Sequence, residues 1–204
     1  ITRFNTSKFS THIAAEVSDA LERDTRFDEA YWSTLDQRSQ FAVSATLSAV
    51  QGAGLSFTPQ NRSQVAVVIA SERPEEERLL EGAKEIISGD IDSASSTLAI
   101  HARPHAPADR IAALLGTSGP TLQIQNHSAG GINAIIEAVS TIQRGDALVA
   151  IAGGAEAPIT PLTLAAYQGA GLLSARNEEP TAASRPLDSG RDGFVLGEGS
   201  VVVI

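Results

Sequence analysis

Apolar residues in the first third of the chain follow two patterns, one typical of a helix and one typical of a buried strand. Residues 36–53 carry apolar side chains at helical spacing, with Asp36 as an N-terminal cap and Gly54 as a stop signal. This spacing places Val43, Leu47, Val50 and Ala53 on one face of the predicted helix. Residues 64–70 form a β-branched run without polar alternation, which predicts a strand covered on both faces and hence a parallel sheet.

The second half of the chain repeats this alternation of strand and helix. Residues 121–125 alternate polar and apolar side chains like a strand, and the residues after Ser128 show helical spacing. That spacing is carried by Ile132, Ile135, Ile136, Val139 and Ile142. Residues 147–152 predict another buried strand, which we expect to end at the glycine pair 153–154. Ser128 is therefore expected at a turn between a strand and a helix.

Three further stretches complete the expected secondary structure. Residues 74–88 place acids before bases, as in a solvated surface helix. Residues 101–107 contain two prolines, which predicts a loop leading into a helix over 108–115. Residues 161–173 predict one more helix. The order of strands and helices indicates a layered α/β domain without an internal linker.

Composition and charge exclude several classes of function. The 204 residues are 42% hydrophobic, which suits one substantial core. The net charge is −9 and no block of lysine or arginine stands out, so nucleic acid is not expected as a partner. Apolar stretches are too short to cross a bilayer, and the first residues lack the layout of a secretion signal. We therefore expect a cytoplasmic protein with no membrane partner.

Cysteine is absent, which excludes disulfides, thiolate metal sites and a thiol nucleophile. His12, His101 and His105 show no ligand spacing, and the chain has neither a dinucleotide fingerprint nor a P-loop. No metal and no cofactor are therefore expected. The chain starts without methionine and ends inside the apolar run 201–204, from which we expect both termini to be cuts and the functional protein to be longer.

Ser128 is the first candidate for chemistry. A residue at the first turn of a helix lies near unpaired backbone N–H groups and the positive end of the helix dipole, which stabilise developing negative charge. Gly130 and Gly131 follow it and remove side chains where a thioester could approach. The alternative is that Ser128 only caps the helix and that the glycines form a packing notch. Taken locally, this alternative is favoured, because serine caps are common.

Three segments of the sequence favour a chemical role for Ser128 over a role as helix cap. Residues 116–120 (GTSGP), the stretch from Arg144 to Glu156 and the loop 184–199 (SRPLDSGRDGFVLGEG) resemble the β-ketoacyl-acyl carrier protein synthase, or ketosynthase, family. Residues 1–9 are similar to a segment near the start of such enzymes. The resemblance implies a thiolase-like layered αβαβα fold. Residues 1–204 would then form an incomplete N-terminal ketosynthase domain, without the first strand and the C-terminal half.

The resemblance also implies a nucleophile position. Counting back from Gly145 with the spacing of the family places it at Ser128, where Asn126-His127-Ser128 stands in place of Thr-Ala-Cys. The hydroxyl of serine stays neutral at such a site, where the thiol of cysteine ionises to a thiolate. Serine therefore needs a neighbouring general base to act as a nucleophile. His127 is the nearby candidate, but consecutive residues at a strand end point to opposite sides. We expect His127 to be packed or hydrogen-bonded rather than to act as a base.

Two functions follow from the resemblance. The first is an atypical ketosynthase of fatty acid or polyketide biosynthesis, an acyltransferase that decarboxylates malonyl-carrier protein or transfers acyl groups instead of completing condensation, since decarboxylation needs positioned donors rather than a covalent nucleophile. The second is a non-catalytic subunit like a chain-length factor, paired with a cysteine-bearing ketosynthase. In both, the histidines and lysine of the family would lie in the C-terminal half.

The implied partners are an acyl carrier protein and a second ketosynthase chain. Family members pair through the strand before the nucleophile, here 121–125, so a homodimer or heterodimer is expected. Asp192 and Glu198, with Asp188 and Arg191, are expected to support the active site as acids paired with arginine. The alternative for these four residues is a salt-bridged surface turn.

Overall fold

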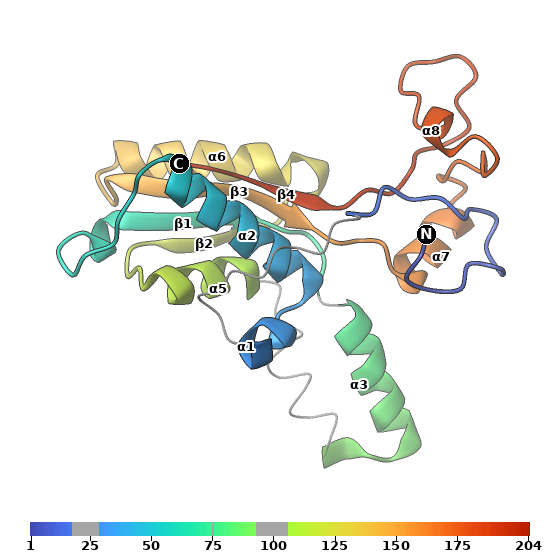
Figure 1. Ribbon diagram of the computed structural model, residues 1–204, viewed down its shortest axis with the longest axis horizontal. Helices are drawn as coiled ribbons and strands as arrows, with labels where there is room; N and C mark the ends of the chain where they lie inside the picture. The colour runs from blue at the N-terminus through green and yellow to red at the C-terminus, as the bar shows by residue number, and fades with distance from the viewer. Residues whose placement is uncertain (18–28, 75, 93–105) are drawn as a thin grey trace. The chain divides into compact units, whose positions relative to one another are not determined.

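The computed structural model describes residues 1–17, 29–74, 76–92 and 106–204, and Figure 1 shows the elements they form. The chain divides into two compact units, which are described separately. The first comprises Ile1–Ala20 and Ala157–Glu198, and the second comprises Leu21–Glu156 and Gly199–Ile204. Within the described residues, no helix is both long and apolar enough to span a membrane.

The second unit is built on a four-stranded sheet. Its strands are β1 (Val65–Ala70), β2 (Thr121–Ile124), β3 (Val149–Glu156) and β4 (Gly199–Val203), in the spatial order β2-β1-β3-β4 (Figure 1). β1 runs parallel to both of its neighbours, which confirms the expected parallel sheet for three strands. β4 joins β3 in the antiparallel direction, so the sheet is mixed rather than wholly parallel.

Helices cover both faces of this sheet. α2 (Gln37–Gly52) packs against β3 and β4, α5 (Ala106–Leu115) against β1 and β2, and α6 (Gly130–Gln143) against all three parallel strands. Every residue of β1 is buried, as its unbroken apolar run predicts. Its residues 65, 67 and 69 join the core beneath α2 and α5, and residues 66, 68 and 70 join the core beneath α6. The remaining elements of this unit are the helices α1 (Glu29–Thr34) and α3 (Glu76–Ser88) and the short 3-10 turns Arg62–Gln64 and His127–Ala129.

The ends of α2 confirm the two signals read from the sequence. The carboxylate of Asp36 accepts a hydrogen bond from the backbone N–H of Ser39, which makes Asp36 the N-terminal cap. At the other end Gly54 has a φ of 63°, a conformation that disfavours residues with a Cβ. The N–H of Leu55 then bonds to the carbonyl of Val50, and this closes the helix with a Schellman motif.

α6 turns its small side chains to the sheet and its large ones outward. Ala134, Ala138 and Thr141 are buried, whereas Ile132 and Ile136 are 58% and 56% exposed. Ile135, Val139 and Ile142 are exposed as well. The helical spacing of these five residues therefore marks an uncovered apolar face, which we call the α6 isoleucine face.

Several predicted bounds were wrong, and the glycines explain two of them. β3 continues through Gly153 and Gly154 instead of ending there. Glycine is needed at position 153 because the neighbouring strand is close: a Cβ there would lie 2.0 Å from the carbonyl oxygen of Val201 on β4. The helix predicted over 161–173 ends at Gly169. Gly171 then adopts a left-handed conformation, and Leu173 forms a β-bridge with Phe194 instead of continuing the helix.

Other bounds differ by fewer residues. The solvated helix predicted from residue 74 is α3, which starts at Glu76, and the strand predicted over 121–125 ends at Ile124. α5 starts at residue 106, two residues before the predicted start. Most of the predicted loop 101–107, with His101 and His105, lies outside the described residues.

The first unit contains two helices, α7 (Pro161–Gly169) and α8 (Pro180–Ala183), joined to long loops. Its core is formed by Ile159, Leu164, Leu173 and Leu196. α7 begins at Thr160, whose hydroxyl accepts a hydrogen bond from the N–H of Thr163.

Candidate active site

Ser128 lies in a short 3-10 turn, His127–Ala129, between the end of β2 and the start of α6. Its side chain is exposed, and no hydrogen bond to it is found among the described residues. The N-cap of α6 is Ala129, which has no side-chain acceptor. The interpretation of Ser128 as the helix cap is therefore wrong. Because no side chain in the described part of the chain caps the first turn of α6, its N–H groups and the positive end of its dipole remain close to Ser128.

The two glycines after this turn have different environments. Gly130 is buried, and a Cβ there would lie 3.2 Å from the Cβ of Ala70 on β1, so it forms the packing notch that lets α6 approach the sheet. A Cβ at Gly131 would meet no atom of the described residues within 4 Å. Of the two residues predicted to bind substrate, only Gly131 leaves open space where an acyl group could approach.

His127 has a φ of 44°, in the left-handed region. Its Nδ1 lies 2.5 Å from Oε1 of Glu72, and 90% of its side chain is exposed. The structure thus contains the expected hydrogen bond, whereas the alternative of a packed side chain is wrong. The argument that His127 and Ser128 must point to opposite sides also fails, because β2 has already ended at Ile124 and the two residues share a 3-10 turn.

Glu72 is a site residue that the sequence analysis missed. It follows β1 by two residues, as His127 follows β2 by three, and the last residues of these parallel strands, Ala70 and Ile124, are paired. The carboxyl ends of neighbouring parallel strands meet at one edge of the sheet. The polar residues that follow β1 and β2 were therefore the signal from which the contact between Glu72 and His127 could have been predicted.

The backbone of Glu72 is held from two sides. Its N–H donates to Oε1 of Glu156 at the end of β3, and its carbonyl accepts from Nε2 of Gln125 at 3.4 Å. Burial raises the pKa of Glu156, while the Glu72 N–H and the charges of Arg38 and Arg73 act in the opposite direction.

Arg38 anchors the segment that carries Glu72. This residue is only 4% exposed, and its guanidinium donates to Oγ of Ser71 at 3.0 Å and to the carbonyl of Arg73. It also pairs with Asp36 at 3.0 Å. The start of α2 thereby fixes the three residues that follow β1, and Glu72 is the middle one.

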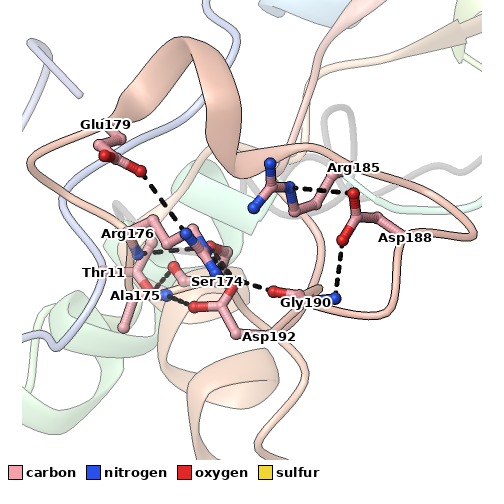
Figure 2. Close-up of polar contacts among 9 residues, drawn as sticks. All are labelled: Thr11, Ser174, Ala175, Arg176, Glu179, Arg185, Asp188, Gly190 and Asp192. Carbon is pink, nitrogen blue, oxygen red and sulfur yellow. Dashed lines mark hydrogen bonds and ion pairs between the residues drawn. The ribbon is translucent and has the colours of Figure 1, made fainter.

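Asp192 lies in the first unit and organises a loop there (Figure 2). Its carboxylate accepts hydrogen bonds from Oγ of Ser174 at 2.7 Å and from the N–H of Ala175 at 3.1 Å. Nε of Arg176 lies 3.6 Å away. The hydrogen bond from Ser174 is the main cause that lowers the pKa of Asp192, despite an opposing contribution from desolvation.

Asp188 and Arg191 stabilise the neighbouring turn. Asp188 accepts from the N–H of Gly190 at 2.7 Å and lies 3.9 Å from Nε of Arg185 (Figure 2). Arg191 donates to the carbonyl of Asp188 at 2.9 Å. These local contacts fit the salt-bridged turn as well as a supporting role.

Glu198 also belongs to the first unit. Its side chain is completely buried, pairs with Arg3 and accepts a hydrogen bond from the N–H of Val17 at 2.9 Å. It therefore holds the beginning of the chain to the end of the loop 184–199. Among the described residues, no group of three potential ligands could hold a metal ion.

Comparison with known sequences identifies the family. The sequence model of the β-ketoacyl synthase N-terminal domain matches residues 2–204, so the chain belongs to the β-ketoacyl synthase family. Two curated relatives are the 3-oxoacyl-[acyl-carrier-protein] synthases 2 of Vibrio harveyi and Synechocystis sp., which are 33% and 35% identical over the whole chain. The match covers 49% of each relative, so the chain spans about half their length.

Solved structures agree with this assignment. A β-ketoacyl synthase from Burkholderia phymatum superposes with a TM-score of 0.85 at 25% identity, over 95% of this chain and 47% of the other. The ishigamide ketosynthase/chain length factor gives a TM-score of 0.79 at 24% identity, over 99% and 49%. The fold is accordingly thiolase-like, as the sequence predicts, and the chain corresponds to the N-terminal half.

Proposed function

We propose that the complete protein is an atypical ketosynthase of fatty acid or polyketide synthesis, which acts on acyl or malonyl thioesters of an acyl carrier protein. The observation that carries the proposal is the position of Ser128 at the start of α6, where it is exposed and where no described residue bonds to its side chain or caps the helix. Relatives named as 3-oxoacyl-carrier-protein synthases support the substrate class.

The reaction we propose is acyl transfer or decarboxylation rather than full condensation. A serine hydroxyl is a much weaker nucleophile than a cysteine thiolate, which slows acyl loading. Decarboxylation of a malonyl thioester instead needs donors placed around the enolate oxygen, and that requirement is electrostatic. The N–H groups at the start of α6 are suitable donors.

The test uses the complete gene product that encodes this chain, incubated with malonyl-carrier protein and followed by mass spectrometry. We expect acetyl-carrier protein or an acyl-protein adduct to form at a rate above that of carrier protein alone. An absence of both products over many hours would refute the enzymatic function.

A non-catalytic role is the second candidate, because one similar structure is named as a ketosynthase/chain length factor. In that case the gene product would co-purify with a cysteine-bearing ketosynthase and show no turnover alone. Co-expression of the two chains, followed by measurement of product length, separates this role from catalysis.

An acyl carrier protein and a second ketosynthase chain are the partners we propose. A similar structure is a type II polyketide acyl-carrier protein in complex with its ketosynthase, which supports the first. For the second, β2 is an edge of the described sheet and pairs with β1 on one side, which leaves a strand edge for a homodimer or heterodimer. Analytical ultracentrifugation of the complete gene product tests the dimer.

The remaining half of the fold is also a proposal. We propose that residues 1–204 are an incomplete domain and that sequence outside them covers the α6 isoleucine face. The chain's match to about half of each relative supports this proposal, as does the large exposed apolar area of α6. For Asp192 and Glu198 we propose a supporting role that consists in holding the loop 184–199 rather than in touching substrate.

A further inference from the structure

We propose that Ser128, His127 and Glu72 form a nucleophile, a general base and an orienting carboxylate for acyl transfer. This inference deepens the proposed function and rests on it, since it assumes that acyl thioesters reach Ser128. It replaces the thiolate chemistry that a chain without cysteine cannot perform at this position.

The tautomer of His127 follows from its partner. An ionised carboxylate only accepts hydrogen bonds, so the contact between Glu72 and Nδ1 places the proton of the neutral ring on Nδ1. Nε2 then carries a free lone pair, and no other hydrogen bond to this ring is found among the described residues. A neutral imidazole in this tautomer is a ready proton acceptor.

The backbone brings the imidazole and the hydroxyl into one turn. His127 and Ser128 are consecutive residues of the 3-10 turn between β2 and α6, and His127 adopts a left-handed conformation there. Residues with a Cβ rarely adopt this conformation, and such strain concentrates at functional sites. Both side chains are exposed, and neither is needed to cap α6.

Glu72 is a positioning residue with unusually firm support. Its N–H is held by Glu156 and its carbonyl by Gln125, while Arg38 holds the residues on either side of it. The surrounding strand ends therefore hold the backbone that carries the carboxylate next to His127. The arrangement follows the logic of a serine, histidine and carboxylate triad, which is defined by roles rather than by order in the sequence.

In the proposed step the acyl group moves from the thiol of the carrier protein to the oxygen of Ser128. Oγ of Ser128 attacks the thioester carbonyl carbon while Nε2 of His127 takes the hydroxyl proton. The tetrahedral intermediate places its oxyanion near the N–H groups at the start of α6. The C–S bond then breaks, Nε2 returns the proton to the leaving thiolate, and the products are a Ser128 ester and a free thiol.

The test measures acylation of the complete gene product by acetyl-carrier protein, with rapid quenching and intact-mass spectrometry. Wild type is expected to gain one acetyl ester at Ser128, and Ser128→Ala is expected to gain none. His127→Gly is expected to lower the acylation rate by about 10²- to 10⁴-fold, the usual contribution of a general base. Glycine suits the left-handed conformation at this position, so the turn is preserved.

Two further readouts separate catalysis from a structural role. Added imidazole is expected to restore a substantial part of the rate to His127→Gly, because it can take the proton in place of the missing ring. Glu72→Gln is expected to lower kcat with little change in KM, and Glu72→Asp should recover part of the loss. His12→Gln, which alters an exposed histidine in the first unit, is the matched control and should acylate like wild type.

The outcomes distinguish this inference from the function on which it rests. If His127→Gly acylates at the wild-type rate, or if imidazole has no effect on a slowed variant, the triad is refuted while acyl transfer stands. If malonyl-carrier protein is decarboxylated without any ester at Ser128, the triad is also refuted. If the wild type turns over no carrier-bound substrate, the proposed function itself fails.

Discussion

Glu156, at the end of β3, is a largely buried acid whose carboxylate accepts a hydrogen bond from the backbone N–H of Glu72. Burial raises its pKa above the ordinary value of 4.5, although the N–H of Glu72 and the charges of Arg38 and Arg73 favour the ionised form. The negative charge of Glu72 acts in the same direction as burial. Ionised Glu156 therefore costs folding free energy that its hydrogen bond only partly offsets.

This raised pKa predicts a pH-dependent stability. Because the folded state binds the proton more tightly, the contribution of Glu156 is fully present below pH 4.5 and is lost as the pH rises through the raised pKa. Relative to Glu156→Gln, the wild type should lose free energy of unfolding over that range. Urea titrations of both proteins at several pH values measure the difference, and two parallel stability curves would contradict the assignment.

The candidate site could be predicted from sequence only in part, and its residues explain why. Ser128 was found because spacing relative to Gly145 is local and the segments around it are distinctive. Glu72 was missed because its contact with His127 joins residues that are 55 positions apart and depends on the pairing of β1 with β2. The left-handed conformation of His127 could not be predicted either, because the residue is not glycine, which is the usual signal for a positive φ.

Among the elements, the loop 184–199 is fixed by one close backbone approach. Gly193 has a φ of 150°, and a Cβ there would lie 2.4 Å from the carbonyl carbon of Leu173 and 2.5 Å from the nitrogen of Ser174. These neighbours are backbone atoms, and hydrogen bonds from Phe194 to Leu172 and from Ser174 to Phe194 hold them in place. The loop therefore needs glycine at position 193.

Gly193→Ala is expected to destabilise the first unit by about 1–3 kcal/mol, through overlap with the backbone and through an unfavourable φ. Gly197→Ala in the same loop is the matched control, because its Cβ would meet only the Cβ of Ala15 at 3.8 Å. Its effect should stay within about 0.5 kcal/mol. Hydrogen exchange of residues 172–194 measures both, and equal protection in the two variants would contradict the close approach.

The element predictions succeeded where a pattern is local and failed where another strand intervenes. The caps of α2 are read directly from Asp36 and Gly54, because capping involves residues within one turn. The glycine pair 153–154 was misread as a strand end, because the reason for glycine there is the approach of β4, about 50 residues later in the chain.

For the molecule as a whole, the exposed α6 isoleucine face supports the proposal that sequence outside residues 1–204 covers this helix. Ile132 and Ile136 lie more than half exposed on it, on a helix whose opposite side packs alanines on the sheet. Apolar patches of this kind mark surfaces that bind other protein. The sequence pattern predicted the helix but could not tell which face meets the sheet, because the larger residues point away from it.

A chain restricted to residues 1–204 is therefore expected to bind a hydrophobic dye and to associate at low concentration. Replacing Ile132 and Ile136 by glutamine should reduce dye binding of this fragment, because the exposed apolar area falls. In the complete gene product the same pair of changes should lower the melting temperature instead. Unchanged dye binding in the fragment, or unchanged stability in the complete protein, would contradict the proposed cover.

The central claim is that position 128 is the place where a carrier-bound acyl group is received. The most direct measurement uses Ser128→Cys in the complete gene product, incubated with acyl-carrier protein and analysed by peptide mass spectrometry. Residues 1–204 contain no native cysteine, so an adduct in this part of the protein can be assigned without ambiguity. We expect an acyl thioester at position 128, formed more rapidly than the ester of the wild type. A variant that stays unmodified at position 128 while its fold and its binding to the carrier protein are intact would contradict it.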